Sequence, residues 1–341
     1  MINSSNTITN FKDYLQQDRY IWNALALTYT SIAYVGGIAL LLLTNPWLNA
    51  IGVICLTHGL ILSAYLAHEF MHGTIFGSRK WNTMFGAVMS WINGACYSRF
   101  SDLAKFHISH HIDRVDLCKF DLAQYVNSLP LFLRNGVLAL EWLYFPALAF
   151  LTRWRSNTAP FWLAERQSER WQVVGIAIVR GSLFTLLGYI SLKALLLYFV
   201  AYISMLNVLR FMDCFQHTYQ VYEIGAPLPK LDHAYEQANT FSNVVSLKQR
   251  WLNLLLLNFG YHNAHHELMK CPWYNLPALD RDLFTGVEVH YVTLPQLVRN
   301  YHRFRLSRIF SGQGVAIDET GKLNLQNFYG GIEVSLLVLP A

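Results

Sequence analysis

The chain has 341 residues, of which 53% are hydrophobic and only 14% are charged, and its formal net charge is +5. Soluble domains carry roughly 25% charged residues, so this composition indicates a membrane protein rather than a soluble one. The modest basic excess suits a surface that faces anionic lipid or an acidic protein partner. The sequence has no basic stripe with interleaved aromatic residues, so it gives no indication of binding to nucleic acid.

The cysteines and the N-terminal segment indicate the cellular compartment. The five cysteines are scattered and form no C-x-x-C pair. This usage predicts neither a disulfide framework nor a zinc ribbon, and it is consistent with a reducing, cytoplasmic environment. The N-terminal segment, residues 1–21, is polar and shows no signal peptide.

Two long apolar runs follow, at residues 22–44 and 48–67, separated by Asn45 and Pro46. Each run is long enough to cross the roughly 30 Å hydrocarbon core of a bilayer, and an Asn-Pro pair is typical of a tight turn. The sequence therefore predicts a first transmembrane hairpin at residues 22–67.

The next segment, residues 68–171, is mixed in character. Its first cations are Arg79 and Lys80, so the positive-inside rule places this segment and the N-terminus in the cytoplasm. We expect residues 81–97 to form an interfacial or re-entrant helix. Charged residues interrupt the apolar run 131–151, so we expect one helix that lies along the membrane surface, although a span is the alternative.

A second hairpin is predicted at residues 172–209, from the apolar runs 172–190 and 192–209. Arg180 lies inside the first run and needs a polar partner. The remaining residues, 210–341, contain no convincing span and should form the rest of a cytoplasmic cap.

Strand-like pieces occur in this cap around residues 287–294 and 332–339. Taken together, residues 1–341 are predicted to be a single-domain, all-α integral membrane protein. It would have four transmembrane helices in two hairpins and a mainly helical cap, with both termini and the active site on the cytoplasmic side.

Three histidine clusters lie in the two segments that these hairpins would place in the cytoplasm, residues 68–171 and 210–341. The clusters are His68 and His72; His107, His110 and His111; and His262, His265 and His266. Positions i, i+3 and i+4 share one face of a helix, and imidazole is the commonest metal ligand. Four spans bring all three clusters to one side of the membrane. Eight ligands exceed one tetrahedral site and fit two metals.

His217 is the natural ninth ligand, because it lies just beyond the last span on the same side. Asp213, one helical turn earlier, either orients a ligand or a metal-bound water or pairs with Arg210. His58 lies too deep in the second run to reach the same metals, so we expect it to bond to a neighbouring helix.

Glu69 and Glu267 adjoin the clusters but point away from the ligand face, which predicts surface positions or positions behind the ligands. Three other histidines, His233, His290 and His302, are expected to have no part in metal binding. An all-imidazole site suits zinc, copper, iron or nickel.

The three clusters on two hydrophobic hairpins resemble the histidine boxes of the membrane-bound fatty acid desaturase superfamily, over about residues 22–285. The resemblance implies an enzyme with two non-haem iron ions that uses O2 and two electrons to remove two hydrogens from a fatty acyl chain in the membrane. By the same resemblance, the eight box histidines and His217 would bind the irons. Three residues separate His68 from His72. This spacing is more similar to that of the acyl-lipid, hydroxylase-like or alkene-forming branches of the superfamily than to that of the stearoyl-CoA type.

The sequence lacks a His-Pro-Gly-Gly haem-binding segment, so the implied electron donor is a separate protein of the ferredoxin or cytochrome type. Arg281 and the run 301–308 could contact it, or could be an ordinary solvated or lipid-facing surface. Related di-iron hydroxylation or alkene-forming decarboxylation is an alternative activity. From other classes, a zinc-dependent membrane hydrolase or receptor would need fewer histidines, and a metal transporter would need ligands in mid-membrane.

Overall fold

The computed structural model describes residues 11–15, 20–332 and 337–341. Within them, four helices are long and apolar enough to cross a membrane. They are α1 (Tyr20–Leu42), α2 (Pro46–His72), α8 (Arg170–Ile190) and α9 (Leu192–Asp213). The prediction of four such helices in two hairpins is confirmed, and α2 and α9 continue past their predicted ends toward the histidine clusters.

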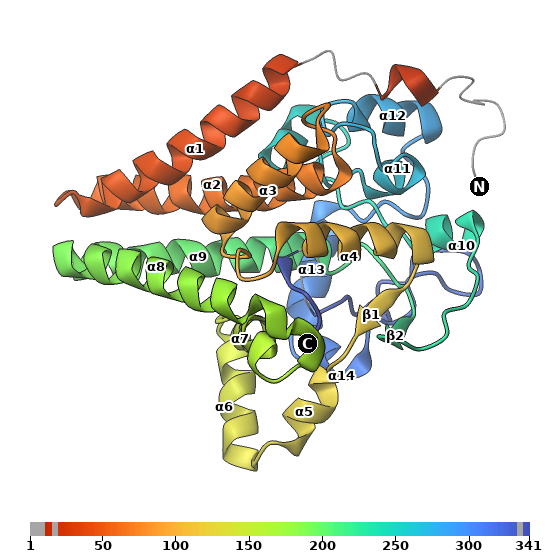
Figure 1. Ribbon diagram of the computed structural model, residues 1–341. Helices are drawn as coiled ribbons and strands as arrows, with labels where there is room; N and C mark the ends of the chain where they lie inside the picture. The colour runs from red at the N-terminus through yellow and green to blue at the C-terminus, as the bar shows by residue number, and fades with distance from the viewer. Residues whose placement is uncertain (1–10, 16–19, 333–336) are drawn as a thin grey trace.

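The two hairpin turns lie at the same end of the molecule (Figure 1). The side chain of Asn45 accepts from the backbone N–H of Trp47 at 2.9 Å and caps α2, and Ser191 caps α9 in the same way. These polar caps satisfy N–H groups that a helix start leaves unpaired. Lys193 donates to Oδ1 of Asn49 at 2.8 Å and so joins the two turns.

Helix α2 is the centre of the packing. It contacts α1, α9, α3 (Arg79–Asn93) and α4 (Phe100–Asp113), and all of its residues from 59 to 72 are buried. Glycine lets α1 approach closely: a Cβ at Gly37 would lie 2.9 Å from Cβ of Leu56, and one at Gly59 would lie 3.0 Å from the backbone N of Tyr34. Small residues at such crossings are typical of helices packed in membranes.

The opposite end of the molecule is a cap of short elements (Figure 1). Its helices are α5 (Leu122–Ser128), α6 (Leu131–Trp142), α7 (Ala147–Thr158), α10 (His233–Ala238), α11 (His262–Glu267), α12 (Leu276–Leu283), α13 (Leu294–Arg303) and α14 (Arg308–Ser311), with 3₁₀ turns η1 (Phe11–Asp13), η2 (Ala159–Phe161), η3 (Ala164–Glu169) and η4 (Arg250–Leu256). Strands β1 (Asp116–Cys118) and β2 (Val221–Glu223) pair in parallel. This pairing ties the chain after α4 to the chain after His217, although neither strand was predicted.

The single helix expected over residues 131–151 is wrong. The structure has α6 and α7 there, bent by 109°. Glu141 is buried, pairs with Arg210 at 3.0 Å and accepts from the backbone N–H of Leu148 at 2.7 Å. The charge that interrupts the apolar run therefore points into the protein and holds the start of α7.

The strand expected at residues 287–294 is also wrong. The carboxylate of Glu288 accepts from the backbone N–H groups of Thr285 and Gly286, at 2.6 and 2.8 Å, and closes the chain into a turn. Only an isolated bridge between Ser242 and Tyr291 remains. Of the second expected strand, residues 332–339, positions 333–336 lie outside the described residues and the others form no strand.

Two polar residues inside the apolar helices have the partners that their position requires. Nδ1 of His58 lies 2.6 Å from the hydroxyl of Tyr29 on α1, as expected for a bond to a neighbouring helix. The guanidinium of Arg180 donates to the carbonyl of Trp91 at 2.5 Å and lies 3.8 Å from Sγ of Cys96.

Candidate metal centre

Helix α2 supplies the first two histidines of the centre. His68 and His72 are one turn apart on its last buried segment. Gly73 then takes a left-handed conformation, with φ of 72°, and its N–H bonds to carbonyls of the last turn. Glycine adopts this conformation without steric cost, so the helix ends directly after its second histidine.

Helices α4 and α11 each contribute to two neighbouring groups of histidines. On α4, His107 and His111 join one group and His110 faces the other. On α11, His265 joins the first group and His266 the second. The histidines at positions i, i+3 and i+4 of one helix therefore belong to two different groups and do not converge on one point. The sequence alone did not show which histidine belongs to which group.

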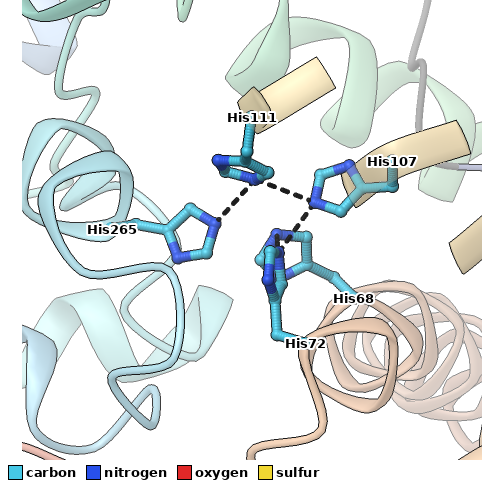
Figure 2. A group of neighbouring side chains, drawn as sticks. All are labelled: His68, His72, His107, His111 and His265. Carbon is cyan, nitrogen blue, oxygen red and sulfur yellow. Dashed lines mark hydrogen bonds between the residues drawn. The ribbon is translucent and has the colours of Figure 1, made fainter. Parts of the chain in front are cut away.

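The five-histidine group consists of His68, His72, His107, His111 and His265, each with one ring nitrogen within 4.8 Å of the others. Figure 2 shows these rings, from three helices, turned toward a common centre. Nε2 of His72 lies 3.2 Å from Nε2 of His68 and 2.9 Å from that of His107. Nε2 of His111 lies 3.2 Å from that of His107 and 3.3 Å from that of His265.

The four-histidine group consists of His110, His217, His262 and His266. Nε2 of His217 lies 3.2 Å from Nε2 of His110 and 2.8 Å from that of His262. Ring nitrogens of His110, His217 and His266 lie within 4.8 Å of one another. His217 reaches the group from the chain just after α9, on the side where the sequence placed it.

These distances fit metal ligation better than hydrogen bonding between rings. A neutral imidazole nitrogen is either a donor or an acceptor, whereas Nε2 of His72 faces two other Nε2 atoms at once. Two nitrogens bound about 2.1 Å from one metal at a right angle lie about 3 Å apart. In addition, Nε2 of His266 is buried and has no partner among the described residues. The histidine cluster could therefore hold metal ions.

Burial keeps six of the histidine rings neutral. Desolvation, followed by repulsion from neighbouring imidazoles, lowers the pKa of His107, His111, His217, His262 and His266 well below the usual value. Desolvation, with repulsion from His110, lowers the pKa of His265 to about 3. A histidine must be neutral to donate a lone pair to a metal, so these six are ready to do so at neutral pH.

Carboxylates lie behind three of the histidines. Glu236, on α10, accepts from Nδ1 of His266 at 2.9 Å, and Asp116, on β1, lies 3.3 Å from Nδ1 of His110. Glu69 is buried, and its Oε1 lies 3.4 Å from Nδ1 of His68. Such partners orient metal-binding rings and raise their basicity.

Glu69 thus stands behind a histidine, one of the two positions expected for it. Glu267 instead pairs with His233 at 2.9 Å near the surface. Asp213 accepts from the hydroxyl of Tyr65 at 3.3 Å, while Arg210 forms its ion pair with Glu141 at 3.0 Å. The other oxygen of Asp213 is buried without a hydrogen-bond partner in the described structure.

A cavity of about 340 Å³ opens beside the centre. His107, His110, His217 and His262 form part of its wall, and Asp213 lies next to them. Most of the remaining lining is apolar. A chain of methylene groups in this cavity would therefore lie against both histidine groups.

The proposed donor-binding run at residues 301–308 is mostly engaged within the protein. Arg308 is buried and donates to the carbonyls of Tyr301 and Phe304 at the end of α13. Arg305 lies over the ring of Tyr144, 4.2 Å from its centroid. These two arginines are therefore not part of a free basic surface.

Sequence reasoning missed Glu236 and Asp116. Glu236 lies 30 residues before His266 in a polar stretch with no periodic signal. Asp116 lies close to the second cluster, but only the parallel pairing of β1 with β2 fixes its position. His233, His290 and His302 lie outside both groups.

Comparison with known proteins gives one result. Residues 45–297 match the family model described as fatty acid desaturase. The matched region begins at the first hairpin turn, ends in α13 and contains all nine histidines of the two groups. No curated protein matches the chain.

Proposed function

Because this chain belongs to the fatty acid desaturase family, a family of oxidoreductases, we propose that it is an O2-dependent fatty acyl desaturase with two iron ions. The nine histidines of the two groups would be their ligands, five on one iron and four on the other. The observation that carries the proposal is the convergence of these nine rings, seven of them buried, from α2, α4, α11 and the chain after α9.

The reaction would convert one saturated methylene pair into a double bond. One O2, two electrons and two protons would be consumed with the two substrate hydrogens, and two water molecules would be formed. Bound iron would supply the oxidising power that an unactivated alkyl chain requires. The protein would hold the chain in the 340 Å³ cavity so that one carbon pair lies beside the histidines.

The carboxylates would keep the ligand rings in their binding orientation. Glu236 and Asp116 would hold the Nδ1 protons of His266 and His110, so that Nε2 of each ring presents its lone pair. Asp213 has an oxygen without a hydrogen-bond partner among the described residues and lies beside the cavity. Its carboxylate would orient a water molecule or the reacting part of the substrate.

The membrane arrangement is part of the proposal. Both hairpins would cross the bilayer, with both termini, the cap and the iron site on the cytoplasmic side. Electrons would come from a separate ferredoxin- or cytochrome-type protein. The acyl substrate would enter from the surrounding lipid, into which the exposed apolar faces of α1 and α8 would be placed.

Product analysis tests the proposed function. The protein is expressed in a host that is fed saturated fatty acids, and the lipids are analysed by mass spectrometry, with His265→Ala as the inactive control. Desaturation predicts products with the same number of carbons and two fewer hydrogens. If the products were only hydroxy acids or only alkenes shorter by one carbon, hydroxylation or decarboxylation would replace desaturation.

A further inference from the structure

The 3₁₀ turn η4 (Arg250–Leu256) presents large apolar side chains that the protein leaves exposed. Trp251, Leu254 and Leu255 are 66%, 45% and 49% exposed. The turn stands between α10 and α11, in the cap, so these side chains do not belong to the four long apolar helices. An exposed apolar cluster of this kind marks a surface that meets another protein or a membrane.

The backbone of η4 is held firmly in place. The buried side chain of Asn253 accepts from the backbone N–H of Val245 at 2.7 Å and donates to the carbonyl of Ser246 at 2.8 Å. It also donates to the hydroxyl of Tyr261, directly before α11, at 3.0 Å. Leu257 then takes a left-handed conformation, with φ of 47°, and ends the turn. The exposed side chains therefore project from a fixed element.

His58 fixes the position of η4 against the first hairpin. The turn packs on α2, and Nε2 of His58 lies 3.0 Å from the carbonyl oxygen of Leu255. Nδ1 of the same ring lies 2.6 Å from the hydroxyl of Tyr29 on α1. A carbonyl only accepts, so Nε2 carries the proton and Nδ1 accepts from Tyr29. His58 lies near the middle of α2, about 15 Å along the helix from His68, so Leu255 lies beside the apolar part of the hairpin.

The carbonyl of Leu255 has the partner that a lipid environment requires. Among the described residues, the backbone N–H groups that follow η4 bond to the carbonyls of Asn253, Leu254 and Leu256, and the carbonyl of Leu255 takes its bond from His58. Water would satisfy a free carbonyl at an aqueous surface, whereas the lipid chains offer no donor. The bond from His58 therefore suits a turn that is surrounded by lipid.

The surroundings of η4 favour lipid over a protein partner. Ile32 is exposed and shares the face of α1 that bears Tyr29, so an apolar surface of the hairpin lies next to η4. Lys248, two residues before the turn, is also exposed, and a cation there suits the head groups of anionic lipid. A protein partner would have to reach the turn at the depth of the membrane-spanning hairpin, where lipid is already present.

We propose that η4 inserts into the leaflet on the cap side of the bilayer, and that His58 holds it at this depth. The side chains of Trp251, Leu254 and Leu255 lie among the lipid chains. The inference rests on the proposed membrane arrangement, because α1 and α2 determine the depth of η4. The bilayer thereby supports the segment that leads into α11 and its three histidines.

Labelling of the full-length, metal-loaded wild-type protein in lipid nanodiscs tests the position of η4. One sample contains a phospholipid with a photoreactive diazirine in its acyl chain, and a second sample is oxidised by hydroxyl radicals in the water. Mass spectrometry of peptides locates both labels. Ile32 is the lipid reference, and Val287, which is exposed in the cap after α12, is the water reference. We expect residues 251–255 to take up lipid label within about twofold of Ile32, and Val287 to be oxidised only.

Replacement of His58 tests the bond that holds η4. His58→Leu removes the hydrogen bonds to Leu255 and Tyr29. We expect backbone hydrogen exchange at residues 257–259, whose N–H groups close the turn, to rise roughly tenfold, while unchanged exchange in α9 shows that the fold is retained. Ser31→Ala, which removes a hydroxyl bond to Leu27 within α1, is the matched control and should exchange as wild type does. Equal exchange in His58→Leu and wild type would overturn the role of His58.

The outcomes distinguish this inference from the proposals on which it rests. Oxidation of residues 251–255 without lipid label, while Ile32 carries lipid label, would overturn the insertion of η4 alone. Protection of residues 251–255 from both labels would also overturn it, because a protein surface would then cover them. Oxidation of Ile32 itself would refute the membrane arrangement together with the inference. Neither measurement needs turnover, so the absence of an unsaturated product would refute only the proposed function.

Discussion

Nδ1 of His266 lies 2.9 Å from Oε1 of Glu236, while Nε2 of the same ring is buried and has no partner in the described part of the chain. The other oxygen of Glu236 accepts from Nε of Arg114 at 2.8 Å. The carboxylate is thus fixed from both sides, and it determines which ring nitrogen carries the proton. This relationship turns the lone pair of His266 toward the four-histidine group.

Replacement of Glu236 by Gln should weaken metal binding. The amide keeps the shape of the side chain but removes the negative charge that raises the basicity of His266. Loss of such a partner typically costs 10- to 100-fold in metal affinity, and we expect roughly tenfold here. Titration of the iron-loaded protein with a chelator measures it. Glu267→Gln, which affects the pair with His233 and a bond from Gln237 but contacts no histidine of the two groups, should retain iron as wild type does; equal retention by Glu236→Gln would count against the role of Glu236.

His265→Ala should remove a ligand from the five-histidine group, where its Nε2 lies 3.3 Å from that of His111. We expect roughly half of the bound iron to be lost, because the other group keeps its ligands. Metal analysis of purified protein measures this loss, and desaturation should cease with it. His290→Ala is the matched control, because His290 packs on Phe284 outside both groups. Equal iron loss in both variants would indicate misfolding rather than lost ligation.

The long helices and the nine histidines could be predicted because their signals are local. An apolar run of about twenty residues is sufficient evidence for a span, and His-x-x-His-His on a helix places three rings on one face. Hence α1, α2, α8 and α9 and the convergence of the three clusters followed from the sequence. The even number of spans also placed His217 beside the clusters.

Features that depend on tertiary contacts could not be predicted. The bend between α6 and α7 accompanies the pairing of Glu141 with Arg210, 69 residues away. Glu236 meets His266 only because α10 packs on α11. The division of one helical face between two histidine groups also depends on how α4 and α11 are placed in the fold, because both groups are compatible with the same spacing.

The packing of α1 on α2 predicts different effects for two adjacent glycines. A Cβ at Gly37 would lie 2.9 Å from both the backbone N and Cβ of Leu56, neither of which can move without shifting α2. A Cβ at Gly36 would meet nothing within 4 Å. Gly37→Ala should therefore destabilise the protein by about 1–3 kcal/mol. Gly36→Ala should be neutral or stabilising by up to about 1 kcal/mol, because Ala favours the helix.

Thermal unfolding of the detergent-solubilised variants compares the two glycines directly. The melting temperature should fall for Gly37→Ala and remain equal or rise for Gly36→Ala. Since both replacements add one methyl group at neighbouring positions of α1, a general effect of alanine on this helix would shift both in the same direction. A fall of equal size in both would contradict the close packing described for Gly37.

Asp280 introduces a pH dependence into the stability of the cap. It is buried on α12, and the hydroxyl of Tyr291 donates to its Oδ1 at 2.8 Å. Burial raises the pKa of Asp280 to about 7, and this effect outweighs the bond from Tyr291 and the charge of Arg250, which lower it; the carboxylate of Glu288 raises it further. The folded protein therefore keeps a proton on Asp280 at pH values where the unfolded chain has lost it.

The sign of the effect follows from this difference in bound protons. Between about pH 4 and pH 7 the folded state binds more protons than the unfolded state at Asp280, so its contribution to stability falls as pH rises, by at most about 1.4 kcal/mol per pH unit. Asp280→Asn keeps an acceptor for Tyr291 but cannot ionise, and it should flatten this part of the pH profile. Melting temperatures from pH 5 to pH 8 measure the slope, with Asp282→Asn, at a partly exposed position of the same helix, as the control. Asp280→Asn removes the titrating carboxyl group. If its slope nevertheless equalled that of wild type and of the control, the pH dependence would have to arise from other groups.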